Sequence, residues 1–224
     1  MADCERIPHN PNQPPLVVVS FMNNQFQALS TPKDLPLLRP FLLDLFCKLA
    51  YQEGDFVLSS GQRSSYYING KQVTLHPQGA LAIGRLLFSM LPADTQAVAG
   101  LTLGADPIVS AVSIVSALEN CPIPGLIIRK QPKGHGTRAY IEGPSLPTGA
   151  KVVVLEDVVT TGQSAMKAVD RLKEAGYQVE LVIALVDRLQ GGAELYKSAG
   201  LMFQALFSIN EIREHYQGSL DQSS

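Results

Sequence analysis

Two adjacent carboxylates, Glu156 and Asp157, stand between an apolar run and a segment rich in hydroxyl and glycine residues. The apolar run at 152–155 is typical of a strand buried in a parallel sheet. Carboxylates can bind two neighbouring sugar hydroxyls, and the backbone N–H groups at the start of a helix can bind a phosphate. We place such a helix at about 162–175. The order of these parts predicts a site for a ribose 5-phosphate.

The segment that opens this helix consists of Thr160, Thr161, Gly162, Gln163 and Ser164. A helix N-cap by itself would require only one such residue, so the whole segment favours a phosphate-binding turn. The segment contains no G-K-[ST] sequence, which argues against an ATPase P-loop. It also lacks G-x-G-x-x-G, which argues against a dinucleotide site.

A second glycine-containing turn, at 100–107, follows another expected core strand. Gly100 and Gly104 flank the turn, and Pro107 stands where the first turn of a helix is expected. The turn is interpreted either as a tight connection or as a set of backbone N–H groups that bind a second anion.

The segment 130–150 interrupts the pattern of helices and strands, because it is rich in glycine and proline and poor in apolar residues. A long segment of this kind is usually a functional lid or a disordered insert. Its basic residues are either solvated surface groups or, on a lid, groups that close over a polyanion. His135 alone is compatible with both interpretations. The basic residues at this segment are Arg129, Lys130, Lys133, His135 and Arg138.

Composition limits the class of protein. The chain has 224 residues with 46% hydrophobic content and a formal net charge of −2, as expected for a soluble globular protein. This charge balance predicts no nucleic-acid partner, and the absence of an apolar run near ~20 residues predicts no membrane span. Cys4, Cys47 and Cys121 are odd in number and widely spaced. They indicate a reducing compartment, so we expect a cytoplasmic protein.

Residues 1–34 are rich in proline, asparagine and glutamine, and we expect them to be irregular or disordered. After them, helices and strands alternate, which predicts an α/β fold with a central parallel sheet flanked by helices. The carboxyl ends of parallel strands share one edge, so the site is expected there. We expect helices at 35–52, 77–91, 106–118, 162–175 and 210–217, and strands at 55–58, 66–69, 96–100, 125–129, 151–155, 179–186 and 201–207.

The segment 152–164 resembles the phosphoribosyl pyrophosphate motif of the type I phosphoribosyltransferases. Three further segments narrow the resemblance to the orotate phosphoribosyltransferases: 56–69 is similar to their N-terminal hood, 129–136 to their catalytic loop and 186–188 to their substrate-carboxylate site. The resemblance covers about 35–217. It implies a type I fold in one domain at 35–224, with a hood mainly at 35–75 and a flexible lid at about 130–143, and with no room for a fused decarboxylase.

The resemblance also implies a reaction. Ribose 5-phosphate would pass from 5-phosphoribosyl 1-pyrophosphate to orotate, giving orotidine 5-phosphate and pyrophosphate in de novo pyrimidine (UMP) biosynthesis. Lys133, His135 and Asp157 would be catalytic, and Glu156 and Asp157 would bind the ribose hydroxyls. The resemblance implies the following residues for phosphoribosyl pyrophosphate: Arg129, Lys130, Lys133, His135, Glu156, Asp157, Val158, Val159, Thr160, Thr161, Gly162, Gln163 and Ser164.

For orotate, the resemblance implies that Arg188 binds the carboxylate and that Thr160, Tyr66 and Tyr67 line the base pocket. A guanidinium fork suits a planar carboxylate. The resemblance further implies a pyrophosphate loop with a non-proline cis peptide at Leu101–Thr102. The residues of that loop are Leu101, Thr102, Leu103 and Gly104.

Mg²⁺ is the implied cofactor, held mainly by substrate and with no direct protein ligand expected. A homodimer with shared sites is implied, in which each lid covers the neighbouring subunit's site. Some family members carry lysine at the positions of Ser59 and Leu103. We interpret the absence of these two lysines as the mark of a subtype within the family. Two other hypotheses stay open: a type I transferase for a purine base, and a non-catalytic sensor of phosphoribosyl pyrophosphate.

Overall fold

The computed structural model describes residues 34–57, 63–133 and 140–221. These residues all belong to one compact unit. Several expectations fall on residues that lie outside the described ones: the irregular extension before Asp34, Ser59, His135 and Arg138. Within the described residues, no helix is long and apolar enough to cross a membrane.

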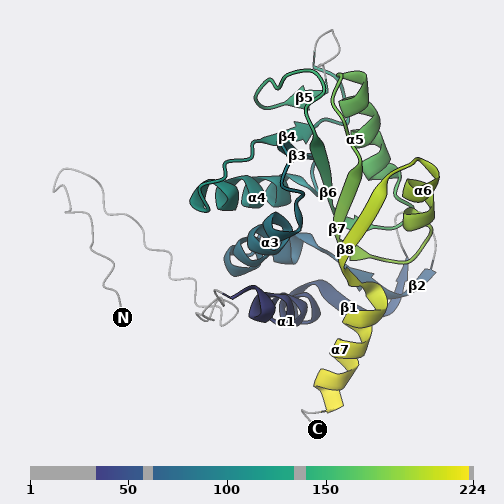
Figure 1. Cartoon of the computed structure of the whole chain (residues 1–224). Coiled ribbons are helices and arrows are strands. Elements are labelled where there is room, and N and C mark those ends of the chain that lie inside the picture. The colour runs from purple at the N-terminus through teal and green to yellow at the C-terminus, as the bar shows by residue number, and fades with distance from the viewer. Residues whose placement is uncertain (1–33, 58–62, 134–139, 222–224) are drawn as a thin grey trace, which may run out of the picture. The chain divides into compact units, whose positions relative to one another are not determined.

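Six of the described strands form one sheet with the order β5-β4-β3-β6-β7-β8 (Figure 1). Neighbouring strands are parallel except β5, which pairs antiparallel with β4 at the edge. The parallel sheet is therefore confirmed, whereas β5 is an addition that the sequence did not indicate. The strands are β3 (Ala97–Leu101), β4 (Gly125–Ile128), β5 (Ile141–Glu142), β6 (Val152–Val159), β7 (Leu181–Asp187) and β8 (Met202–Ser208).

The long helices lie close to their predicted positions, and the differences have local causes. The helix expected at 35–52 is wrong at its end, because a π-helical turn follows Leu45 and the chain enters a strand at Tyr51. Two short helices, α2 and α6, were not predicted. The helices are α1 (Leu35–Leu45), η2 (Phe46–Ala50), α2 (Lys71–Thr74), α3 (Pro77–Met90), α4 (Asp106–Leu118), α5 (Gln163–Glu174), α6 (Gly192–Ser198) and α7 (Ile209–Asp221).

Side chains of β6 alternate between the two faces of the sheet and build two apolar cores. Val153 and Leu155 belong to the core that α3 and α4 cover, whereas Val152 and Val154 belong to the core that α5 covers. Because the first half of β6 is buried on both faces, residues 152–155 form a continuous apolar run. This double burial fixes the position of the residues that follow at its carboxyl end.

A smaller antiparallel pair, β1 (Tyr51–Val57) and β2 (Arg63–Ile68), forms the hood beside the sheet. Both strands are longer than predicted, and a bulge interrupts the register between Glu53 and Phe56. Tyr51 packs against Tyr66 of β2, with ring centroids 5.9 Å apart, and edge-on against Tyr216 of α7 at 5.1 Å. These aromatic contacts join the hood to the C-terminal helix.

Two glycines, Gly162 and Gly191, cap the amino ends of α5 and α6 in the left-handed region, with φ of +80° and +95°. Their surroundings differ. A Cβ at Gly162 would lie 3.0 Å from Cζ of Tyr196, whereas a Cβ at Gly191 would meet nothing within 4 Å. Substitutions at these two glycines therefore distinguish the cost of backbone strain, which both positions share, from the cost of steric crowding, which arises only at Gly162.

We predict that Gly162→Ala destabilises the protein more than Gly191→Ala. Each change places a side chain at positive φ, which costs about 1–3 kcal/mol. Only Gly162→Ala also forces a methyl group against the Tyr196 ring, which adds about 1–3 kcal/mol. Unfolding in urea measures both free energies, and equal losses in the two variants would contradict the packing described here.

Candidate active site

Glu156 and Asp157 lie within β6, which continues to Val159. The expectation that the strand ends at Leu155 and that both carboxylates follow it is therefore wrong. The β7 pairing extends past the acidic pair, with Val158 opposite Val186, and this keeps the segment extended. Successive residues of a strand point to opposite faces, yet the two carboxylates stay close enough for Asp157 to raise the pKa of Glu156.

Glu156 is buried, with 6% of its surface exposed. Burial, followed by the neighbouring charge of Asp157, raises the pKa of Glu156 well above its ordinary value. Its Oε2 atom has no hydrogen-bond partner within the described part of the chain. Lys130 acts in the opposite direction on the pKa, but its effect is the smallest of the resolved causes. A buried acceptor of this kind is suited to a ligand hydroxyl.

Asp157 packs directly on the turn that follows β3. A Cβ at Gly104 would lie only 2.7 Å from Oδ1 of Asp157, so only glycine allows this approach. The same Oδ1 accepts a hydrogen bond from the N–H of Val158 at 2.9 Å. The predicted ribose carboxylate and the predicted pyrophosphate loop are thus brought together by the structure.

The pyrophosphate loop contains a cis peptide, but it joins Thr102 and Leu103. The expectation of a cis bond at Leu101–Thr102 is therefore wrong by one residue. The Thr102 hydroxyl donates to Oδ2 of Asp106 at 2.8 Å, which ties the loop to the first turn of α4. Leu103 is 66% exposed.

The structure supports the interpretation of the glycine turn at 100–107 as a tight connection, whereas the binding of a second anion by its backbone N–H groups stays a prediction. A Cβ at Gly100 would lie 2.2 Å from Cβ of Ala105, so Gly100 permits a tight connection between β3 and α4. Gly104 instead allows the approach to Asp157 described above.

The hydroxyl-rich segment forms a pocket of about 80 Å³ at the amino end of α5. Thr161, Gln163 and Ser164 are exposed there, whereas Gly162 is buried. The start of α5 offers backbone N–H groups that have no partner inside the helix, as a phosphate requires. The pocket is lined by Glu156, Val158, Val159, Thr160, Thr161, Gly162, Gln163, Ser164 and Tyr196.

Arg188 follows β7 and reaches the hood. Its Nε donates to the hydroxyl of Tyr66 at 3.0 Å, and its guanidinium carbon lies 5.0 Å from the centroid of that ring. Its backbone N–H donates to the carbonyl of Val159 at 2.9 Å, which places it beside the end of β6. Tyr66 is buried and Tyr67 is 41% exposed. Of the residues predicted for the base, Arg188 and Tyr66 are therefore in contact, whereas Tyr67 packs against Phe56 with ring centroids 5.6 Å apart.

Two of the described basic residues of the predicted lid, Arg129 and Lys133, pair with a carboxylate that the sequence did not single out, Glu142 of β5. Arg129 Nη1 lies 2.9 Å from Oε1 of Glu142, and Lys133 Nζ lies 3.6 Å from the same atom. The hydrogen bond from Arg129 and the charge of Lys133 lower the pKa of Glu142. Lys133 is mostly exposed and pairs with Glu142. The last residues of the predicted lid, Ile141–Glu142, belong to a strand.

Tyr196 of α6 is the second site residue that the sequence did not reveal. It lines the phosphate pocket although it is far from the motif in sequence. An isolated tyrosine in a short helix is typical of a core position, so no local signal could have identified it.

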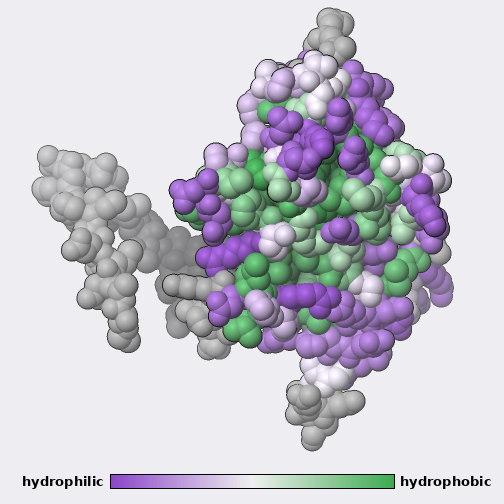
Figure 2. All heavy atoms as spheres, in the orientation of Figure 1, coloured by the Kyte–Doolittle hydropathy of each residue, from purple (hydrophilic) through white to green (hydrophobic). Residues whose placement is uncertain are grey.

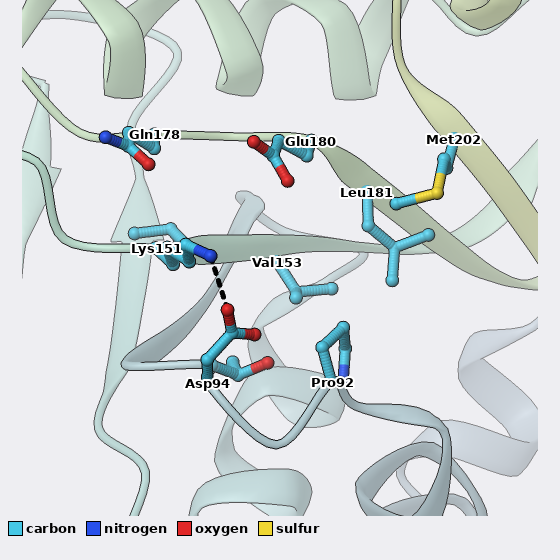
Figure 3. A pocket seen from close by; sticks show the side chains of 10 residues that line it. Pro92, Asp94, Lys151, Val153, Gln178, Glu180, Leu181 and Met202 are labelled. Carbon is cyan, nitrogen blue, oxygen red and sulfur yellow. Dashed lines mark hydrogen bonds and ion pairs between the residues drawn. The ribbon is translucent and has the colours of Figure 1, made fainter.

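Another pocket, of about 140 Å³, lies at the opposite end of the sheet. Figure 3 shows it between the starts of β6, β7 and β8, where the Lys151 ammonium and the Asp94 carboxylate face each other as an ion pair. Ligands of open α/β sheets bind at the carboxyl ends of the strands. We therefore place the candidate active site at the carboxyl ends of the strands, where Glu156 and Asp157 lie.

The chain was compared with known proteins. Residues 69–216 match the model of the phosphoribosyl transferase domain. The orotate phosphoribosyltransferase of Nostoc sp. is 77% identical over 184 residues, which cover 82% of this chain and 89% of the relative. That of Synechocystis sp. is 66% identical over 192 residues, covering 85% and 97%.

Solved structures give the same result. The crystal structure of Mycobacterium tuberculosis H37Rv orotate phosphoribosyltransferase in complex with Fe(III) dicitrate has a TM-score of 0.69 and 35% sequence identity, and the match covers 78% of this chain and 98% of that one. The complex of the same protein with 5-phospho-alpha-D-ribosyl 1-diphosphate has a TM-score of 0.66 and 34% identity, with the same coverage. Fold, site and relatives agree: the chain belongs to the phosphoribosyltransferase family and, within it, to the orotate phosphoribosyltransferases.

Proposed function

We propose that the chain transfers the ribose 5-phosphate group of phosphoribosyl pyrophosphate to orotate, in de novo pyrimidine biosynthesis. The observation that carries this proposal is the position of Arg188. Its backbone N–H bonds to the carbonyl of Val159, just before the hydroxyl-rich turn, and its guanidinium, which suits a carboxylate, reaches Tyr66 of the hood. A site for an acidic base and a site for a ribose phosphate are therefore adjacent.

We assign binding of the ribose 5-phosphate group to the residues at the carboxyl end of β6. We assign the ribose hydroxyls to Glu156 and Asp157, because Oε2 of Glu156 lacks a partner among the described residues and Asp157 borders the pyrophosphate loop. We assign the 5-phosphate to the turn from Thr160 to Ser164, where the helix dipole of α5 favours an anion.

The base half rests on Arg188 and the hood. Arg188 is held by the Tyr66 hydroxyl, which fixes the direction of its guanidinium while leaving donors for a carboxylate. We also assign Tyr67, the next residue of β2, to the base pocket; its side chain is 41% exposed. The neighbouring Thr160 completes the proposed orotate contacts.

In the reaction, a ring nitrogen of orotate forms a bond to C1 of the ribose while the bond from C1 to the pyrophosphate oxygen breaks. Positive charge develops on the sugar, and the bonding electrons leave with pyrophosphate. The carboxylates of Glu156 and Asp157 are placed to stabilise the sugar, whereas Lys130 and Lys133 would stabilise the leaving group. Since Lys133 pairs with Glu142, it must exchange this carboxylate for pyrophosphate.

The residues present fit a magnesium ion that is held mainly by substrate. No group of three or more histidine, cysteine, aspartate or glutamate side chains that could hold a metal occurs among the described residues. Mg²⁺ commonly binds one or two carboxylates together with substrate phosphates, and Glu156 and Asp157 supply two carboxylates at the ribose. When bound, the ion would neutralise charge on the pyrophosphate.

We further propose a homodimer in which each lid covers the neighbouring site. Ile114 and Leu118 support this proposal, because they lie four residues apart on α4 and are 63% and 69% exposed. Figure 2 also shows apolar residues across the middle of the visible face, bordered by hydrophilic ones. A cytoplasmic location is part of the proposal and is consistent with the free thiols of Cys47 and Cys121.

The activity is tested by incubating the protein with phosphoribosyl pyrophosphate and Mg²⁺. We expect consumption of orotate but not of adenine or xanthine, because Arg188 requires a carboxylate on the base. EDTA should stop the reaction and added Mg²⁺ should restore it. Use of a purine would favour the purine-transferase hypothesis, and binding without turnover would favour a sensor.

The role of Arg188 predicts a selective defect. Arg188→Ala should raise the KM for orotate about 10- to 100-fold, because a charge-assisted contact is lost, with a smaller effect on the KM for phosphoribosyl pyrophosphate. Arg188→Lys keeps the charge without the planar fork and should be intermediate. Arg171→Ala, on the last turn of α5, is the matched control. An unchanged orotate KM in Arg188→Ala would refute the assignment.

Shared sites predict recovery of activity from two inactive variants. Lys133→Ala and Asp157→Asn should each lower kcat about 10²–10³-fold, because each removes a group that stabilises the transition state. If Lys133 acts in the partner's site, random mixed dimers hold one intact site, and roughly a quarter of the wild-type activity should return. Demonstrated subunit exchange without recovery would show that each site uses its own lid.

A further inference from the structure

Tyr196 is fully buried, with 0% of its surface exposed, and its ring packs against Phe203 with centroids 5.0 Å apart. Phenylalanine would provide the same apolar ring, so packing does not account for the hydroxyl. A buried tyrosine hydroxyl is usually hydrogen-bonded, since leaving it unpaired costs free energy. Within the described residues this hydroxyl has no partner.

The second unpaired atom at the same pocket is Oε2 of Glu156. The two residues are close enough for the charge of Glu156 to contribute to the raised pKa of Tyr196, after the larger effect of burial. Both side chains line the same pocket, where the Tyr196 hydroxyl can donate a hydrogen bond and Oε2 of Glu156 can accept one. Neither atom has a hydrogen-bond partner among the described residues. Their requirements are complementary, because one needs a donor and the other can donate.

The helix α6, which carries Tyr196, packs closely against the turn at 159–162 at two points. A Cβ at Gly162 would lie 3.0 Å from Cζ and 3.1 Å from the hydroxyl oxygen of Tyr196. A Cβ at Gly192, at the start of α6, would lie 2.3 Å from Cγ1 of Val159 and 3.2 Å from the carbonyl oxygen of Thr160. Any movement of Tyr196 would thus be transmitted to the loop.

We propose that Tyr196 is a positioning residue for phosphoribosyl pyrophosphate, whose hydroxyl is linked through a bound water to Oε2 of Glu156 and so fixes the ribose carboxylate relative to the phosphate loop. The pocket of about 80 Å³ is large enough for such a water. This inference rests on the proposed function, because it assigns a role within the ribose-phosphate half of that site.

Tyr196→Phe tests the hydroxyl without removing the ring. We expect the KM for phosphoribosyl pyrophosphate to rise about tenfold, corresponding to one lost hydrogen bond, while the KM for orotate changes less than twofold. The thermal stabilisation by phosphoribosyl pyrophosphate alone should fall in parallel, which gives a readout independent of turnover. Tyr177→Phe, at another buried tyrosine outside the pocket, should leave all three quantities unchanged.

A double-mutant cycle with Glu156→Gln tests the link between the two residues. If Tyr196 acts through Glu156, adding Tyr196→Phe to Glu156→Gln should weaken phosphoribosyl pyrophosphate binding less than it does in the wild type. Independent effects would overturn the proposal, as would wild-type binding by Tyr196→Phe. An inactive wild-type protein that still binds phosphoribosyl pyrophosphate would refute only the proposed function, because the binding cycle could still be measured.

Discussion

The close approach of the Asp157 carboxylate to the backbone of Gly104 is the contact on which the arrangement of the site depends. It requires β3 and β6 to be neighbours, and their parallel register pairs Ala97 with Val152 and Ala99 with Val154. That register in turn depends on the burial of β6 on both faces. The apolar residues before the acidic pair therefore do more than stabilise the fold, since they set the separation between the acidic pair and the turn at 101–104.

Charge is distributed unevenly around this contact. The acidic pair is partly or fully withdrawn from water at the centre of the sheet, and its burial keeps the pKa of Glu156 high. The cations of the lid instead pair with Glu142 at the edge strand. A polyanionic substrate would compete with Glu142 for these cations. By binding them, it would draw their positive charge toward the acidic pair. Binding and rearrangement of the lid would thus be coupled electrostatically.

Much of the site could be predicted because its residues are contiguous. The acidic pair, the turn to Ser164 and the start of α5 follow one another along the chain, so local pattern determines both structure and position. Tyr196 and Glu142 could not be predicted, since each acquires its place only through packing between distant elements. The acidic pair was expected after the strand because carboxylates usually end an apolar run, but pairing with β7 continues to Val159. The π-helical turn after Leu45 also escaped prediction, because its apolar residues follow an ordinary helical pattern.

The two ends of the lid are fastened to each other. The N–H of Arg129 donates to the carbonyl of Tyr140 at 2.8 Å, and β5 continues this pairing toward β4. A chain that leaves and returns at one point can extend only half of its contour length. For residues 130–139 this limit is roughly 17 Å at 3.3–3.6 Å per residue. If this segment acts as the predicted lid, a pair of subunits that shares a site would have to hold its base within roughly that distance of the site that its backbone reaches.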